Sequence, residues 1–276
     1  MSAGARAALP WLGMLRYLRL LGIQLRASTA VAMQYRLDFL VQGGLALFWT
    51  AWGIVPLLVV FGKRAGVAGW TFEEALVVIG WFMVMKGVLE GAVNPSLASV
   101  VEHIRKGTLD FVLLKPADAQ FLVSTQKFQP WRVVDALGGV AIFVVAFHRL
   151  GRWPAPAHVV AATLLLGCAA LILYSLWILV VSAAFFVVKV DNLSYLFVSI
   201  FDAARWPADV FRGALRAIFT FVVPIAIMTT FPARALLGKD FGPAQGAGAL
   251  AGAVLFAGFA RLVWLRSIGR YTYASS

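Results

Sequence analysis

The chain has 276 residues, of which 62% are hydrophobic and only 13% are charged. A soluble domain has about 25% charged and about 45–50% apolar residues, so this composition excludes an ordinary soluble globular domain and indicates an integral membrane protein. The net charge of +12 would favour nucleic acid as the partner of a soluble protein. Beside membrane spans, basic residues instead fix the orientation and contact anionic lipid, so we expect membrane lipid and no nucleic acid among the partners.

The first predicted element, residues 11–36, is a basic amphipathic helix. Met14, Leu18, Leu21 and Leu25 follow one another at steps of three or four residues, so they share one face of a helix. The arginines beside this face are Arg16, Arg19 and Arg26. A helix of this kind lies along the inner membrane surface. An ordinary helix packed on cytosolic protein is the alternative.

Seven apolar segments follow the amphipathic helix. A spanning helix needs about 20 mostly apolar residues. The segments are 39–61, 75–94, 133–149, 159–188, 192–206, 217–233 and 241–260. Asp202, Arg205 and Pro207 cut the fifth segment short, and Pro224 and Pro232 interrupt the sixth. The sequence therefore permits either seven spans or six.

The side of the membrane on which the termini lie distinguishes the two counts. Seven full crossings place the termini on opposite sides, whereas six crossings and a re-entrant hairpin place them on the same side. Both terminal stretches carry several arginines, with no acidic residue before Asp38 or after Asp240, so both ends are expected in the cytoplasm. We predict one all-α integral membrane domain over residues 1–276. It has six transmembrane helices, the N-terminal interfacial helix and an extracellular re-entrant hairpin at 207–240, before the last span.

Several tryptophans lie inside predicted spans rather than near span ends, where an interfacial belt explains such residues. They include Trp49, Trp52 and Trp81. Aromatic faces at these positions can line a cavity and hold a flat or cationic substrate. Plain packing is the alternative. We treat the three tryptophans as candidates for lining a substrate path.

The second span carries two opposite charges, Lys86 and Glu90, four residues apart and therefore on one helix face. Each charge would cost about 2.5–3.5 kcal/mol at the bilayer centre, and an i,i+4 ion pair returns only a few tenths of a kcal/mol. The two side chains are therefore expected to face the protein interior or a wet cavity. They either line the substrate path or form a buried structural pair, and Glu90 has the further option of reaching the inner interface.

The longest polar stretch, residues 95–132, lies on the cytoplasmic side in this topology. Gly107 is suited to end one helix in a left-handed turn, and Thr108 is suited to N-cap the next helix, which Pro116 would stop. The apolar stripe of that second helix would consist of Leu109, Val112 and Leu113. The pattern predicts a two-helix elbow with an exposed basic corner that presses on a cytosolic partner. A purely structural surface loop is the alternative.

The charges of the elbow agree with this reading. Asp110 would lie in the first turn of the second helix and Lys115 in its last turn, the positions that the helix dipole favours. The run from Ile104 to Pro116, I-R-K-G-T-L-D-F-V-L-L-K-P, resembles the signature of permease subunits in the ABC-2-type transporter superfamily. The resemblance is to a bacterial branch of drug-exporting or uncharacterised permeases. It extends through the run P-x₇-P-A-x-x-L-L-G that begins at Pro224.

This resemblance implies six helices in each subunit, two permease subunits in each transporter and a location in the bacterial inner membrane. It also implies that the elbow is the coupling element seated on a separate ATP-hydrolysing subunit. Carried over position by position, the residues that line or shape that contact are Glu102, Arg105, Lys106, Gly107, Asp110, Lys115 and Pro116. Permeases of this branch often occur as two different chains, so a heterodimer is slightly favoured over a homodimer.

Charged residues recur at steps of three and four beyond the fifth apolar segment. They are Asp202, Arg205, Asp209, Arg212 and Arg216. On one helix face they would rim the extracellular exit as a gate, or they would form a ladder of ion pairs on the re-entrant hairpin. Pro207 interrupts the series and makes the single face provisional.

The sequence carries no G-x-x-x-x-G-K-[ST] motif for nucleotide, so ATP and Mg²⁺ belong to the partner and no cofactor is expected in this chain. The single cysteine, Cys168, excludes an intrachain disulfide, and no residues have metal-ligand spacing. We expect no catalysis by the chain itself. The sequence thus favours the permease subunit of an ATP-driven exporter, with a path between its first, second and fifth spans. An ion-gradient-driven secondary transporter or channel and a membrane scaffold are the alternatives.

Overall fold

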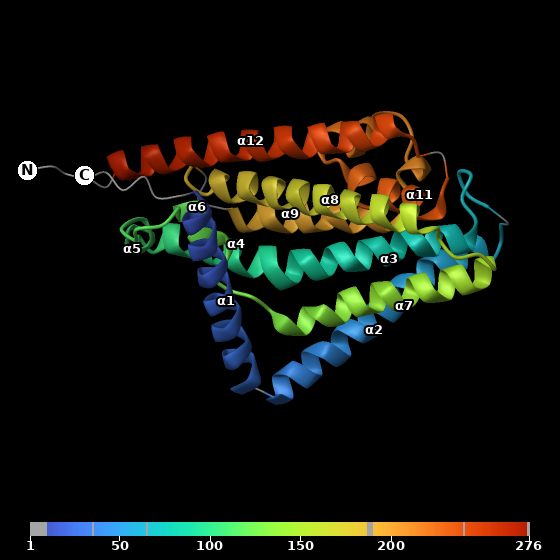
Figure 1. Ribbon diagram of the computed structural model, residues 1–276, viewed down its shortest axis with the longest axis horizontal. Helices are drawn as coiled ribbons and strands as arrows, with labels where there is room; N and C mark the ends of the chain where they lie inside the picture. Colours follow the sequence, from blue (N-terminus) through green and yellow to red (C-terminus); the bar gives the residue numbers. More distant parts are fainter. Residues whose placement is uncertain (1–9, 35, 65, 187–189, 240, 275–276) are drawn as a thin grey trace, which may run out of the picture.

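A computed structural model of the protein describes residues 10–34, 36–64, 66–186, 190–239 and 241–274. Residue 35 of the predicted helix 11–36, residues 187–188 of the predicted segment 159–188 and residue 240 of the predicted hairpin lie outside these ranges. The described residues form helices, with one isolated bridge between Val67 and Trp70. Most helices lie along one axis as a bundle, and an amphipathic helix crosses it (Figure 1). The all-α prediction is confirmed for the described residues.

Five helical stretches among the described residues are long and apolar enough to cross a membrane. They are Phe39–Phe61, Phe72–Arg105, Pro130–Leu150, Pro156–Ala183 and Pro243–Tyr271. The elements that contain them are α2 (Arg36–Phe61), α3 (Phe72–Val88), the π-helical turn η1 (Leu89–Val93), α4 (Asn94–Arg105), η2 (Pro130–Arg132), α7 (Val133–Leu150), α8 (Pro156–Ala183) and α12 (Pro243–Ala274). The first to fourth apolar segments and the last one therefore form long helices as predicted.

The second span is longer than the sequence indicated. Residues 95–105, assigned above to the cytoplasmic loop, continue the helix as α4. Pro95 has no N–H and would normally leave the carbonyl of Gly91 without a helical partner. The backbone N–H of Gln129 donates to that carbonyl over 2.8 Å, so the helix passes through Pro95 with its backbone groups satisfied. The helix therefore continues past residue 95, where the predicted cytoplasmic loop begins, and supplies the first helix of the elbow.

The amphipathic helix α1 (Pro10–Gln34) runs across the bundle, roughly perpendicular to α3 and α7 (Figure 1). Its apolar face is largely uncovered, since Leu18 is 56% exposed and Leu25 is 42% exposed. The predicted helix thus forms.

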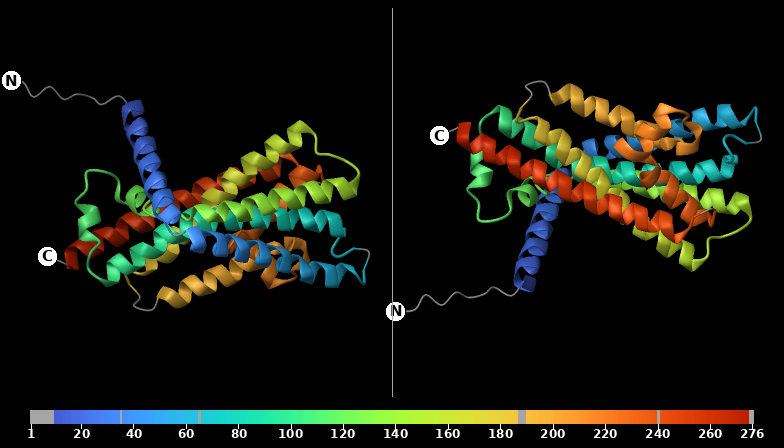
Figure 2. Two further views of the ribbon diagram at one scale, coloured as in Figure 1. Left: turned by 90° about the horizontal axis from the view of Figure 1, so that it is seen from below. Right: turned by 90° about the horizontal axis from the view of Figure 1, so that it is seen from above.

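The chain between the fourth long helix and α12 is irregular. Helix α9 (Val190–Asp202) has only 13 residues and continues into η3 (Ala203–Arg205). The elements that follow are η4 (Ala208–Val210), α10 (Ala214–Ala217), η5 (Ile218–Val222), η6 (Ala226–Thr230) and α11 (Phe231–Leu237). They gather at the end of the bundle where α2 joins α3, whereas α4 and the C-terminal end of α12 lie at the opposite end (Figures 1 and 2).

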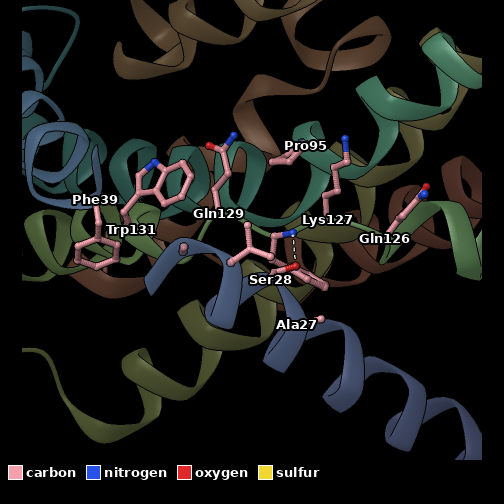
Figure 3. A pocket seen from close by; sticks show the side chains of 11 residues that line it. Ala27, Ser28, Phe39, Pro95, Gln126, Lys127, Gln129 and Trp131 are labelled. Carbon is pink, nitrogen blue, oxygen red and sulfur yellow. Dashed lines mark hydrogen bonds between the residues drawn. The ribbon is translucent and has the colours of Figure 1, made fainter. Parts of the chain in front are cut away.

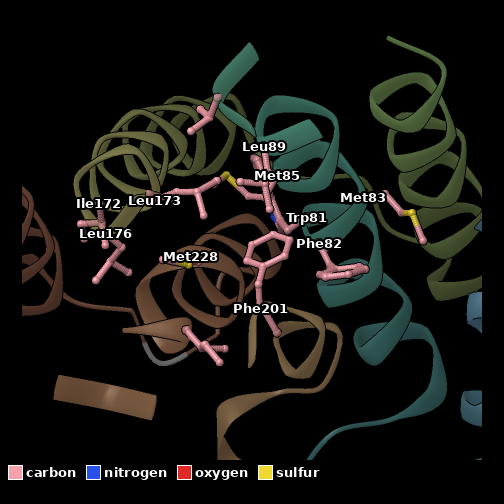
Figure 4. Close-up of a cluster of buried hydrophobic side chains, with 14 of the residues drawn as sticks. Trp81, Phe82, Met83, Met85, Leu89, Ile172, Leu173, Leu176, Phe201 and Met228 are labelled. Carbon is pink, nitrogen blue, oxygen red and sulfur yellow. The ribbon is translucent and has the colours of Figure 1, made fainter. Parts of the chain in front are cut away.

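Helix α3 is the centre of the packing. Every residue from Glu74 to Met83 is buried, and large side chains from α3, α8 and the irregular segment meet around it. Figure 4 shows this core; the rings of Phe82 and Phe201 have centroids 5.3 Å apart. On the other side, Gly139 of α7 lies so close to α3 that a Cβ built on it would be 2.6 Å from the carbonyl oxygen of Gly80. Small residues permit this close approach of two membrane helices.

We expect Gly139→Ala to destabilise the fold by about 1–3 kcal/mol, because the added methyl group meets backbone rather than a movable side chain. The measurement is thermal unfolding of the detergent-solubilised protein. Gly167→Ala is the matched control, since that glycine on α8 has no atom within 4 Å of the added position. Equal melting temperatures for both variants would contradict the close α3–α7 packing.

Candidate functional site

The elbow begins where α4 ends, and its turn is as predicted. Gly107 has a left-handed φ of 66°. The N–H of Thr108 donates to the carbonyl of His103 over 2.9 Å, and the N–H of Gly107 donates to the carbonyl of Ile104 over 3.2 Å. This paired arrangement is the Schellman motif that ends many helices. The left-handed turn at Gly107 is therefore confirmed.

The second helix of the elbow, α5 (Asp110–Leu113), differs from the prediction in its caps. Its N-cap position is Leu109, which makes no side-chain capping bond. The Thr108 hydroxyl instead lies 2.8 Å from His103 Nδ1, so the proposed N-cap by Thr108 is wrong. Asp110 lies in the first turn as predicted, but α5 ends before Lys115.

The surface of the elbow combines charge with exposed apolar side chains. Leu109 and Val112 are buried and Leu113 is partly buried, as the predicted stripe requires, but Phe111 is 70% exposed and Leu114 is 81% exposed. Most of the residues assigned above to the coupling contact are exposed around them. These are Glu102, Arg105, Lys106, Gly107, Lys115 and Pro116, whereas Asp110 is half-buried. Glu102 and Lys106 form an exposed ion pair of 2.6 Å.

The chain leaving the elbow is held by a polar cluster around Asp118. This carboxylate accepts the backbone N–H of Phe121 over 3.0 Å and thereby caps α6 (Ala119–Ser124). Arg261 of α12 donates to its two oxygens over 2.6 and 3.2 Å and to the Gln120 side chain over 2.9 Å. The hydroxyl of Tyr17 on α1 accepts the N–H of Asp118 over 3.1 Å. Asp118 thus ties the elbow to the last helix through its carboxylate and to the first helix through its backbone N–H.

This Asp118 cluster has two further features. Gln120 and Ser124 both bond the hydroxyl of Tyr174 on α8, at 3.0 and 2.7 Å. Burial raises the pKa of Asp118, but hydrogen bonds from Arg261 and from the Phe121 N–H outweigh it and leave that pKa below its ordinary value. The sequence analysis did not identify this cluster, because Arg261 lies 143 residues away from Asp118 along the chain.

The end of the loop is joined to the second span near its π-helical turn. Ser96 Oγ donates to the carbonyl of Lys127 over 2.6 Å, and the same Oγ accepts the N–H of Lys127 over 3.0 Å. Between this loop and α1 lies a cavity of about 500 Å³. Figure 3 shows Ser28 of α1 facing the loop, where it accepts the N–H of Phe128 over 3.1 Å, with Trp131 farther along the cavity.

Lys86 and Glu90 do not pair with each other. Glu90 lies in the π-helical turn η1, where α-helical spacing no longer holds. Its carboxylate accepts from Asn94 over 3.2 Å and lies 3.8 Å from the guanidinium of Arg132. The Lys86 side chain makes no ion pair or hydrogen bond with any other residue that the structure describes. The alternative of a buried Lys86–Glu90 pair is therefore excluded.

A pocket of about 250 Å³ brings together residues that the sequence analysis had assigned to two different sites. Trp49 and Trp52 come from α2 and Lys86 from α3, all three candidates for the substrate path. Asp202 at the end of α9 and Arg205 in η3 complete the pocket and were assigned to an outer gate. The structure therefore places these five side chains around one cavity.

Trp81 does not line this pocket. Its ring is 5% exposed, and its centroid lies 5.1 Å from that of Phe143 on α7. Arg205 lies 3.1 Å from the Asp202 carboxylate, and its guanidinium stacks over Phe82 at 5.4 Å. Arg205 and Asp202 therefore satisfy each other within the pocket, whereas Trp81 belongs to the α3–α7 interface.

The remaining charges of the expected ladder form a separate cluster at the end of the bundle where α2 joins α3. The chain is not one helix over residues 202–216, because it is extended at Trp206 and Phe211. The Asp209 carboxylate accepts from Arg234 over 2.7 Å and from the Trp70 indole over 3.1 Å, with Arg216 at 3.4 Å. The single-face ladder is therefore wrong.

Two observations complete this outer cluster. The ammonium of Lys239 contacts the Glu74 carboxylate at 2.8 Å and the carbonyl of Gly69 at 2.7 Å. Arg212 is exposed and makes no ion pair with any residue in the described ranges. Of the four gate candidates, Asp202 and Arg205 therefore line the pocket, and Asp209 is the central acceptor of the outer cluster. Arg212 belongs to neither site.

Comparison with known families agrees with this architecture. Residues 47–275 match the family described as ABC-2 family transporter protein. Since the match covers most of the chain, the protein belongs to this family. It is a multi-pass membrane permease component of an ABC transporter. No curated protein and no solved structure matches it. Among the described residues, no group of three or more His, Cys, Asp or Glu side chains is placed to hold a metal ion.

We expect Asp118→Asn to loosen residues 117–129, because the variant loses the charge that Arg261 contacts while keeping the side-chain size. The cost is about 1 kcal/mol for this partly exposed pair, which corresponds to roughly fivefold faster amide hydrogen exchange in the segment. Glu102→Gln is the control, since its pair with Lys106 is fully on the surface. Unchanged exchange in Asp118→Asn would show that the cluster does not hold the elbow.

The same cluster predicts a pH dependence. Because the pKa of Asp118 is lowered in the folded protein, its stabilisation is complete above the ordinary aspartate pKa and is lost as the pH falls through the lowered value. We expect the exchange of residues 117–129 to accelerate over this acidic window, beyond the intrinsic exchange rate, in the wild type. In Asp118→Asn the corrected rate should not change over that window.

Proposed function

We propose that this chain is the transmembrane subunit of an ATP-driven exporter and that its elbow docks on a separate ATPase subunit. The observation that carries the proposal is the exposed pair Phe111 and Leu114 at the tip of the elbow. Exposed apolar side chains rimmed by charge mark protein interaction sites in water. The tip lies at the end of the bundle where α4 ends, beyond α3 (Figure 1). ATP and Mg²⁺ would reside on the ATPase.

The proposed orientation places the elbow and both termini in the cytoplasm of a bacterial cell, with the bundle in the inner membrane. In this orientation the perpendicular helix α1 lies in the plane of the inner interface, where its exposed Leu18 and Leu25 meet lipid. Helix α9 provides the sixth crossing in a short form. The segment 207–240 is then a re-entrant hairpin that opens toward the outside, supported by its bonds to the α2–α3 connection.

We further propose that two permease subunits assemble, with a heterodimer slightly favoured by the family resemblance. Helix α2 supports this assembly because side chains along it remain exposed, including Trp49 and Trp52. The pocket between α2, α3 and α9 opens at this face. Two such faces together enclose a path between the first, second and fifth spans. ATP binding would then shift the population between inward-open and outward-open states.

One observation favours a second function. Lys86 and Asp202 are ionisable residues inside the bundle, and such residues mark ion pathways as well as substrate sites. An ion-gradient-driven transporter would use these residues without any ATPase. The two functions differ in whether a soluble subunit binds the elbow.

We expect the double variant Phe111→Ser, Leu114→Ser to lose a co-purifying ATPase, because the substitutions remove the apolar surface without touching the buried Leu109 and Val112. The measurement is affinity purification in mild detergent, with quantification of the bound soluble subunit and its ATPase rate. A loss of at least tenfold in bound ATPase is expected, equivalent to about 1.4 kcal/mol.

Trp153→Ser is the matched control, because Trp153 is 64% exposed but lies in the connection between α7 and α8. It should retain the ATPase. Arg105→Ala and Asp110→Ala test the charged rim of the same contact. If no ATPase co-purifies with the wild type, the exporter proposal fails, and ion-gradient transport assays on Lys86 and Asp202 variants follow.

A further inference from the structure

We propose that the pocket between α2, α3 and α9 binds the headgroup of a singly charged anionic amphiphile, with Lys86 as its counter-ion. This inference rests on the proposed function, since it names the substrate class for the same permease. The pocket is lined by aromatic, apolar and charged side chains. Those that carry the argument are Trp49, Trp52, Phe82, Lys86, Asp202 and Arg205.

The charges of the pocket leave one cation uncompensated. Arg205 donates to the Asp202 carboxylate at 3.1 Å and to the Asp202 carbonyl at 2.9 Å. Lys86 has no acidic side chain within ion-pair distance among the described residues. Two cations and one carboxylate therefore give the pocket a net charge of +1, which matches one monovalent anionic headgroup.

The depth of Lys86 makes this charge costly without a ligand. It lies in the long helix Phe72–Arg105, about 20 Å along the axis from Phe72 at a rise of 1.5 Å per residue. Trp49 and Trp52 lie near the middle of α2, which runs from Arg36 to Phe61. An ammonium at such depth is unfavourable unless it is paired or hydrated. An anionic headgroup entering the pocket supplies the missing pair.

The shape of the pocket indicates an amphiphile rather than a small ion. A cavity of about 250 Å³ holds a headgroup, and its wall on α2 consists of tryptophans that are more than half exposed. Phe48 continues this wall, with its ring stacked on Trp52 at a centroid distance of 6.2 Å. A hydrocarbon chain attached to the headgroup can therefore lie along the apolar face of α2.

The same charges argue against a cationic substrate. Aromatic walls attract cations, and Trp49 and Trp52 by themselves would suit one. Lys86 and Arg205 oppose it, because a third positive charge in this low-dielectric site would be repelled by both. Asp202 offers no independent attraction, since Arg205 already holds its carboxylate. Selection by charge therefore favours the anion.

The experiment uses the purified permease, with any subunits that accompany it, in lipid nanodiscs. Three photoreactive probes carry the same alkyl chain, with a diazirine beside the headgroup. The headgroups are a sulfonate, a neutral alcohol and a trimethylammonium. After irradiation, mass spectrometry locates and quantifies the labelled residues. The sulfonate is expected to label the pocket walls on α2 and α3, and the two other probes to label them at least tenfold less.

Lys86→Gln should reduce sulfonate labelling of these walls about tenfold, the effect of one charge-assisted contact. Lys86→Arg keeps the charge and should retain the labelling. Lys127→Gln is the matched control, because Lys127 lines the separate cavity beside α1. Thermal melting of each variant verifies the fold. The melting temperature of Lys86→Gln should not fall, because the substitution removes a charge from the membrane.

Several outcomes would overturn the proposal. These are equal labelling by alcohol and sulfonate, preference for trimethylammonium, or full sulfonate labelling of Lys86→Gln. A fourth is dissociation of a permease dimer by Lys86→Gln, with no preference for sulfonate. It would identify a carboxylate of the second subunit as the counter-ion. ATPase co-purification is scored on the same samples, so failure of the headgroup site and failure of the exporter proposal are distinguishable.

Discussion

Inside a bilayer, every backbone N–H and C=O needs a protein partner, and this constraint governs where the chain departs from an α-helix. Two of the departures described above are compensated by other segments. The carbonyl of Gly91, released by Pro95, accepts the N–H of Gln129. In the broken stretch after α9, the Thr230 hydroxyl accepts the N–H of Ala208, and Thr229 donates to the carbonyl of Ala204, both over 2.9 Å. The irregular segments are therefore integral parts of the packing.

The two ends of the bundle use polar side chains in the same way. At the elbow end, the Asp118 carboxylate accepts from α6 and α12, and its backbone N–H donates to Tyr17 of α1. At the other end, Asp209 gathers Trp70, Arg234 and Arg216. Each aspartate joins segments far apart in the chain, so each fixes a connection that apolar packing alone would leave free to slide. The unpaired Lys86 lies between the two ends and stands out against this pattern of satisfied charges.

The sequence predicted the elements better than their contacts. Apolar length located the five long helices, and Gly107 revealed the turn of the elbow, because both signals are local. Lys86 and Glu90 do not form the i,i+4 pair that was one alternative, because a π-helical turn at Glu90 changes the residue spacing. The single-face ladder over residues 202–216 was wrong because Pro207 and Gly213, with φ of 59°, redirect the chain.

Asp118 and Arg261 escaped notice because no local pattern links them. The convergence of Trp52, Lys86 and Asp202 on one pocket likewise depends on tertiary packing.

One continuous helix, Phe72–Arg105, carries both Lys86 and the base of the elbow, roughly 28 Å apart along its axis. At Pro95 the helix relies on the N–H of Gln129 rather than on its own backbone, and the π-helical turn Leu89–Val93 lies just before that point. Glu90 in that turn lies 3.8 Å from the guanidinium of Arg132 in η2. A twist applied at the Arg105 end of the helix would have to pass through the five residues of the turn to reach Lys86. The torsional stiffness of the turn would then set how much of that twist arrives at the pocket.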